Sequence, residues 1–134
     1  FPYTTLFRSG ATQRACTMKF LLLCQIQPAA FAHVPEAAQQ QMHQAMDAYH
    51  QQLIAAGVLV GAGQLAMPHE AVLVSHADGQ ARETRGPALA GDTQIGGFYL
   101  LDVAGEKEAV AWAGQCPLAQ VAALEVREVA YSPL

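Results

Sequence analysis

The chain has 134 residues, of which 52% are hydrophobic and only 13% are charged, and its formal net charge is −4. This length fits one domain, and the high apolar content excludes an intrinsically disordered chain. The 7 Lys and Arg residues form no cluster, so we expect no nucleic-acid partner.

Cysteine usage and hydropathy indicate the compartment. Cys16, Cys24 and Cys116 show no paired spacing, which is typical of a reducing cytosol rather than of a disulfide framework. The longest apolar run, around residues 20–24, is too short to span a bilayer. We therefore expect a cytoplasmic protein with no membrane segment.

The first seventeen residues have neither helical nor strand periodicity. Residues 1–9 resemble the translated sequence of a short-read sequencing adapter. Our hypothesis is that residues 1–17 are a non-native or disordered extension ahead of Met18, and that residues 18–134 form a single domain. The alternative is a natural N-terminal tail. Matching codons in the genome upstream of Met18 would exclude a sequencing-adapter origin for these residues.

Hydrophobic periodicity and turn-forming residues predict the secondary-structure elements from Met18 onward. The apolar stripe Met42, Met46, Tyr49 and Leu53 has helical spacing, and Asp78-Gly79 is a strong hairpin signal. In chain order we expect a strand at 18–26, a loop at 29–34, a helix at 36–56, strands at 58–65, 71–76, 80–84 and 94–103, a helix at 105–116 and a strand at 124–129.

This order contains two strand–helix–strand units, which is typical of the ferredoxin-like α+β fold. Such a fold places two helices on one face of an antiparallel sheet and leaves the other face in need of a cover. The usual cover is a second copy with the sheets face to face. The low charge content also favours a subunit interface, so we expect a homodimer.

A family resemblance rests on several segments: residues 49–68, Gly86-Pro87, residues 94–100, the Trp112-Ala113 and Cys116-Pro117 pairs, and residues 125–127. Together they resemble the YCII-related family in its DGPF-domain branch, from Met18 to about Val129. The resemblance implies a dimeric α+β barrel with a pocket between sheet and helices. It also implies activities like those of small lyases or dehydrochlorinases, or a role beside sigma-factor regulators.

The chain departs from that family at its proposed site. The Asp-Gly-Pro-Phe box is replaced by Arg85-Gly86-Pro87-Ala88, which removes the acid and the aromatic group. The histidine of a His–Asp pair suggested for relatives falls at or near Met46. The acid–base pair that the resemblance implies therefore does not carry over to this sequence.

Candidate catalytic residues are His50, His69 and Asp92. His43, Asp47 and His50 share one stripe of the first helix, where they could exchange protons or hold a divalent ion. The alternative is a solvated polar edge, and we expect no resident metal and no cofactor. His69 lies at a strand interruption, and Asp92 lies in the loop before the glycine pair.

Candidate substrate-binding residues are Arg85, Tyr99, Tyr49, Gly96 and Gly97. Arg85 would favour an anionic ligand such as a carboxylate, unless it forms a surface ion pair with a neighbouring acid. Tyr99 follows the glycine pair and could place its hydroxyl in the pocket. The glycines allow close approach of a ligand or of another strand.

The sequence leaves open whether the protein is an enzyme. The leading hypothesis is cofactor-independent acid–base chemistry, of the lyase or isomerase type, on a small apolar or anionic compound. The alternatives are a non-catalytic ligand-binding or regulatory dimer, in a sigma-factor system, and a purely structural dimer. An enzyme requires a titratable group and an anchor that converge in one cavity, near Arg85 and Tyr99.

Overall fold

The computed structural model describes residues 17–133, so the proposed N-terminal extension lies, except for Thr17, outside the described residues. Its elements are β1 (Met18–Ile26), α2 (Pro28–Phe31), α3 (Glu36–Ala55), β2 (Leu59–Gln64), the 3-10 turn η1 (Pro68–Glu70), β3 (Val72–Ala77), β4 (Gln80–Arg85), β5 (Gln94–Val103), α4 (Glu106–Gln115), the 3-10 turn η2 (Pro117–Gln120) and β6 (Ala123–Glu128). The predicted strands and the two long helices are all present, with ends displaced by no more than one residue.

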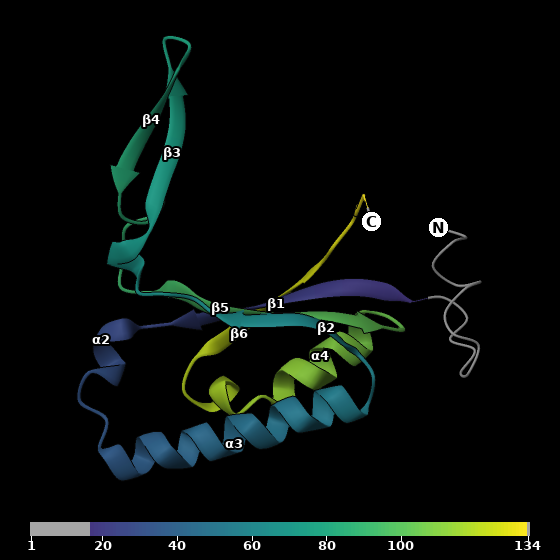
Figure 1. Ribbon diagram of the computed structural model, residues 1–134. Coiled ribbons are helices and arrows are strands. Elements are labelled where there is room, and N and C mark those ends of the chain that lie inside the picture. The colour runs from purple at the N-terminus through teal and green to yellow at the C-terminus, as the bar shows by residue number, and fades with distance from the viewer. Residues whose placement is uncertain (1–16, 134) are drawn as a thin grey trace.

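A four-stranded sheet in the order β2-β5-β1-β6 forms the centre of the protein, and its neighbouring strands are antiparallel. Helices α3 and α4 lie on the same face of this sheet (Figure 1). The predicted α+β class is therefore confirmed, and the strand order is compatible with a ferredoxin-like fold. The dimeric barrel remains a prediction.

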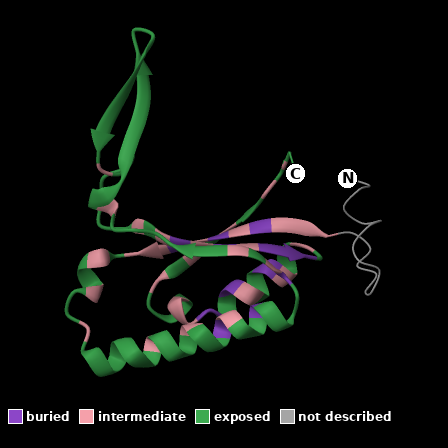
Figure 2. Ribbon diagram, viewed as in Figure 1, coloured by how far each residue is buried: buried purple, intermediate pink, exposed green. Residues whose placement is uncertain are grey.

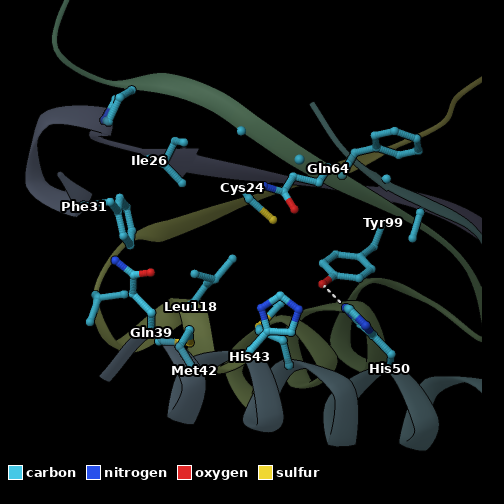
Figure 3. Close-up of a pocket in the computed structure, with 18 of the residues that line it drawn as sticks. Cys24, Ile26, Phe31, Gln39, Met42, His43, His50, Gln64, Tyr99 and Leu118 are labelled. Atoms are coloured by element: carbon cyan, nitrogen blue, oxygen red, sulfur yellow. Dashed lines mark hydrogen bonds between the residues drawn. The ribbon is translucent and has the colours of Figure 1, made fainter. Parts of the chain in front are cut away.

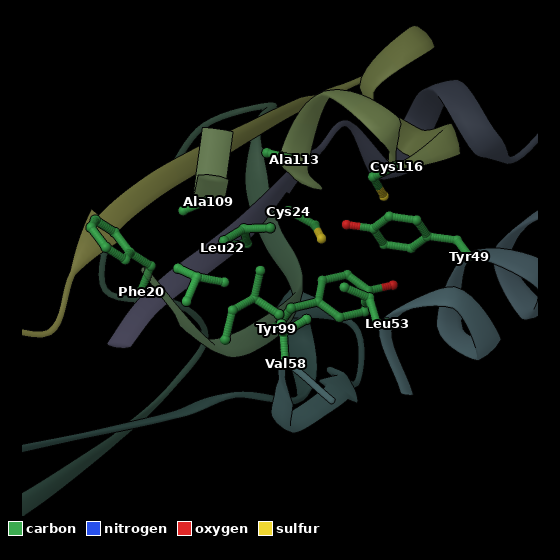
Figure 4. Packing of buried hydrophobic residues seen from close by; sticks show 12 residues of the cluster. Phe20, Leu22, Cys24, Tyr49, Leu53, Val58, Tyr99, Ala109, Ala113 and Cys116 are labelled. Carbon is green, nitrogen blue, oxygen red and sulfur yellow. The ribbon is translucent and has the colours of Figure 1, made fainter. Parts of the chain in front are cut away.

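The core lies between this sheet and the helices (Figure 2). Because side chains alternate along a strand, one face of β1 and β5 is buried at every second position. Opposite these strands, α3 contributes Tyr49 and Leu53, and α4 contributes two alanines (Figure 4). The largest fully buried side chains are those of Phe20, Leu22, Leu53, Leu101, Val103 and Cys116.

A short helix replaces part of the loop that we expected at residues 29–34. Helix α2 begins at Pro28, and its first turn is closed by the Ala30 amide, which donates to the Gln27 carbonyl at 2.9 Å. Proline is favourable at this position because its φ is preset and its missing N–H has no partner in the first turn. Pro28 therefore both ends β1 and starts α2.

The predicted hairpin at Asp78-Gly79 is confirmed. Both turn residues have positive φ, 52° and 77°, as a two-residue type I′ turn requires. Within residues 17–133, strands β3 and β4 pair only with each other, in a separate two-stranded sheet, and all their residues are exposed. The hairpin rises from the side of the main sheet opposite to the helices (Figure 1).

Gly97 allows β2 and β5 to approach each other closely. A Cβ atom at Gly97 would lie 2.9 Å from the Gly63 carbonyl oxygen, a backbone atom of the neighbouring strand. We expect Gly97→Ala to lower the free energy of unfolding by about 1–3 kcal/mol, because the backbone must move. Gly61→Ala is the matched control, since nothing lies within 4 Å of a Cβ there. Urea unfolding curves that show equal losses for both variants would contradict this account.

Candidate functional site

A cavity of about 910 Å³ opens between the sheet and the first half of α3 (Figure 3). Its walls come from the last residues of β1 and of β2, from the first half of β5, and from α2, α3 and η2. This volume is within the range of small-molecule sites, roughly 300–1,000 Å³. The cavity is thus large enough for an organic ligand.

The cavity exists because only the second half of α3 is packed against the core. Of the predicted apolar stripe, Tyr49 and Leu53 are buried, whereas Met42 and Met46 are half-buried and line the cavity. The flexible thioethers of methionine adapt to irregular apolar shapes. The first half of the stripe therefore provides a wall for a ligand rather than part of the core.

His50 and Tyr99 form the polar contact inside the cavity. The His50 Nε2 atom lies 2.7 Å from the Tyr99 hydroxyl oxygen, and the ring centroids are 5.5 Å apart. Both residues line the cavity, with Tyr99 buried and His50 half-buried. Burial raises the pKa of Tyr99, and the neighbouring Cys116 and Cys24 raise it further. The phenol therefore stays protonated near neutral pH and supplies a stable hydrogen-bonding group beside the imidazole.

His43 and Asp47 also line the cavity, about two turns and one turn of the helix before His50, and both are exposed. The predicted polar stripe thus lines the cavity, with His50 half-buried and its other two members exposed to solvent. Within residues 17–133, no group of three or more His, Cys, Asp or Glu side chains is arranged to hold a metal ion. The three residues share a face but do not form a set of metal ligands.

Gly96 and Gly97 contribute backbone to the cavity wall. A Cβ atom at Gly96 would run into the side chain of Ile26, which lines the same cavity. The missing side chains therefore leave room for Ile26 at Gly96 and for the backbone of β2 at Gly97, so the two glycines shape the sheet side of the cavity through close packing of the protein itself.

The other predicted site residues do not line this cavity. The Arg85 guanidinium donates to the Glu70 carbonyl at 3.1 Å, at the base of the hairpin. His69 and Asp92 are exposed, in η1 and in the loop before β5. Tyr49 is buried in the core, where its hydroxyl donates to the Trp112 carbonyl at 2.8 Å. Arg85 ends the hairpin strand β4, which extends away from the main sheet (Figure 1). Arg85 and Tyr99 therefore do not meet in the cavity, contrary to the expectation from the sequence.

Several residues that line the cavity could not be predicted from the sequence. Leu118 and Val121 come from the segment around η2, which shows no periodicity, and Phe31 comes from the unexpected helix α2. Cys24 also lines the cavity, but burial, with a smaller contribution from Cys116, raises the pKa of its thiol to about 11. The thiol therefore stays neutral near pH 7 and is a poor nucleophile.

The fold and the site together define a small α+β domain with a ligand-sized cavity between its sheet and a helix that carries histidines. A family model, the YCII-related domain, matches residues 18–131, and the chain therefore belongs to the YCII-related family. Comparison with curated proteins gave no significant match. No helix in residues 17–133 is both long and apolar enough to cross a membrane.

Proposed function

We propose that the protein binds a small, largely apolar compound in this cavity and exchanges a proton with it through His50. The observation that supports this proposal best is the 2.7 Å contact between His50 Nε2 and the Tyr99 hydroxyl on the cavity wall. It joins a proton-exchanging side chain of α3 to a hydrogen-bonding group of β5, at one end of the space that a ligand would fill (Figure 3).

The two side chains have different roles in this proposal. Imidazole is the side chain suited to taking up and releasing protons near neutral pH. The phenol of Tyr99 keeps its proton, because burial raises its pKa. Tyr99 therefore orients the imidazole and donates or accepts a hydrogen bond, while His50 carries the proton.

The class of reaction that fits this arrangement is an elimination or isomerisation without a cofactor. His50 would take a proton from a carbon or oxygen of the ligand and return it, either to another ligand atom or to water. His43 and Asp47 line the cavity and are exposed to solvent, so water can reach the site and re-equilibrate the proton.

Deuterium exchange tests the proposal with simple carbonyl compounds as probes. Apolar ketones and β-diketones would be incubated with the protein in D₂O, and the loss of their α-proton signals would be followed by NMR. We expect faster exchange with the wild-type protein than with buffer for ligands that fit the cavity. Ligands that bind while their exchange rate stays at the buffer value would contradict proton transfer.

A non-catalytic ligand-binding module is the second candidate function. It is supported by the solvent exposure of His43 and Asp47, because their surroundings perturb exposed acid and base groups less than buried ones. Such a module would change its affinity for a partner protein when the ligand is bound. We propose that this partner belongs to a sigma-factor system. Binding without exchange, with a change in partner affinity, would favour this alternative over catalysis.

The predicted homodimer also remains a proposal, supported by the sheet face opposite the helices. On that face Leu21 is paired with Leu100, and Leu23 with Phe98, and all four are only half-buried. A second copy would cover them and remove apolar surface from water. Sedimentation equilibrium that shows only monomer at micromolar concentration would exclude this arrangement.

A further inference from the structure

We infer that the cavity selects an elongated ligand with a neutral hydrogen-bonding head, and that Asp47 rejects anionic heads. This inference rests on the proposed function, since it specifies the class of ligand for the same cavity. It differs from the sequence-based expectation of an anionic ligand, which depended on Arg85.

The cavity is long and has different chemistry at its two ends. Helix α3 lines it from Ala38 to His50, a span of about 18 Å at the rise of an α-helix. The polar pair of His50 and Tyr99 lies at one end (Figure 3). Phe31 and Ile26 lie at the other (Figure 3), together with the Gln39 amide, which donates to the Val34 carbonyl at 2.9 Å. An extended molecule with one polar end and one apolar end matches this distribution.

The charge of the lining decides which polar head is accepted. Among residues 17–133, Asp47 is the carboxylate that lines the cavity, and no Lys or Arg of this part of the chain lines it. An anionic head would therefore meet a like charge with no fixed cation to compensate it. A cationic head that reached His50 and Tyr99 would lose hydration beside two side chains that carry no negative charge, and the Asp47 carboxylate, which is exposed and screened, would offset only part of that cost. A neutral amide, hydroxyl or carbonyl group can form hydrogen bonds there without either cost.

Three probes with the same ten-carbon chain separate these cases: decanamide, decanoate and decylamine. Binding would be measured by isothermal titration calorimetry with the whole chain at pH 8 and low ionic strength. At this pH free imidazole is neutral, whereas the carboxylate and ammonium heads are charged. We expect decanamide to bind at least about tenfold more tightly than decanoate, because only the amide avoids an unpaired charge in the cavity.

Substitution of Asp47 tests its role directly. We expect Asp47→Asn to raise the affinity for decanoate by about fivefold, the size of one charge contact in water, and to leave decanamide binding unchanged. Added salt should weaken the wild-type preference, since the carboxylate is exposed and therefore screened. Glu36→Gln is the matched control, because Glu36 lies on the same helix but does not line the cavity.

Each alternative outcome has a distinct meaning. If decanoate or decylamine bound as tightly as decanamide or more tightly, the neutral-head inference would be overturned while the cavity remained a ligand site. If Asp47→Asn had no effect on decanoate binding, the assignment of Asp47 would be overturned. If none of the three probes bound, both the inference and the proposed ligand-binding function would be overturned.

Discussion

Replacement of His50 by alanine is expected to lower the rate of enzyme-dependent proton exchange by about 10²–10⁴-fold, the usual contribution of a positioned acid–base group. The variant removes the imidazole that contacts the Tyr99 hydroxyl and leaves the rest of the cavity lining in place. The rate would be measured by NMR in D₂O with any ligand whose exchange the wild-type protein accelerates. Because His50 is half-buried and not part of the core cluster, the fold should be retained.

Two further variants make this result specific. His76→Ala removes an exposed histidine of the hairpin that does not line the cavity, and it should leave the rate unchanged. Tyr99→Phe keeps the ring but removes the hydroxyl, so we expect a smaller loss than for His50→Ala. Equal rates for the His50→Ala variant and the wild-type protein would rule out His50 as the proton carrier.

Leu53→Ala is expected to lower the free energy of unfolding by about 2–5 kcal/mol, the range for truncating a buried leucine. The Leu53 side chain is fully buried, with 0% exposure, and only Leu53 and Tyr49 of α3 are buried. These two residues hold the second half of the helix against the core. The loss would be measured by urea unfolding with extrapolation to water.

Ile54→Ala is the matched control, because Ile54 is the next residue of the same helix and is 56% exposed. It should change stability by no more than about 0.5 kcal/mol, as is usual for surface substitutions. If both variants lost the same amount, Leu53 would not anchor α3. The position of His50, less than one helical turn earlier, would then need another explanation.

The local elements could be predicted because their signals are local. Strand β5 reads as a buried apolar run, α3 as a helix with a period near 3.6, and the Asp78-Gly79 turn as residues that accept positive φ. The stripe of His43, Asp47 and His50 follows from helical spacing alone. These features depend on neighbours within a few residues, so a single sequence is sufficient to find them.

The arrangement of the site could not be predicted in the same way. His50 and Tyr99 are 49 residues apart, and their contact depends on how α3 crosses the sheet. Arg85 was expected near Tyr99, but the direction of the hairpin is set by the backbone at its base, where the Gly86 amide donates to the Ala71 carbonyl at 2.7 Å. Periodicity identifies the two hairpin strands but gives no indication of where the hairpin points.

The most direct test of the central claim is to map ligand binding by ¹H–¹⁵N NMR during titration with decanamide. The account predicts that shift changes concentrate in the cavity, at His50, Tyr99 and the Gly96-Gly97 amides. It also predicts no change in the hairpin at 72–85, which lies on the other side of the sheet (Figure 1). Saturable shifts confined to the hairpin or to the opposite sheet face, with the glycine pair unaffected, would contradict it.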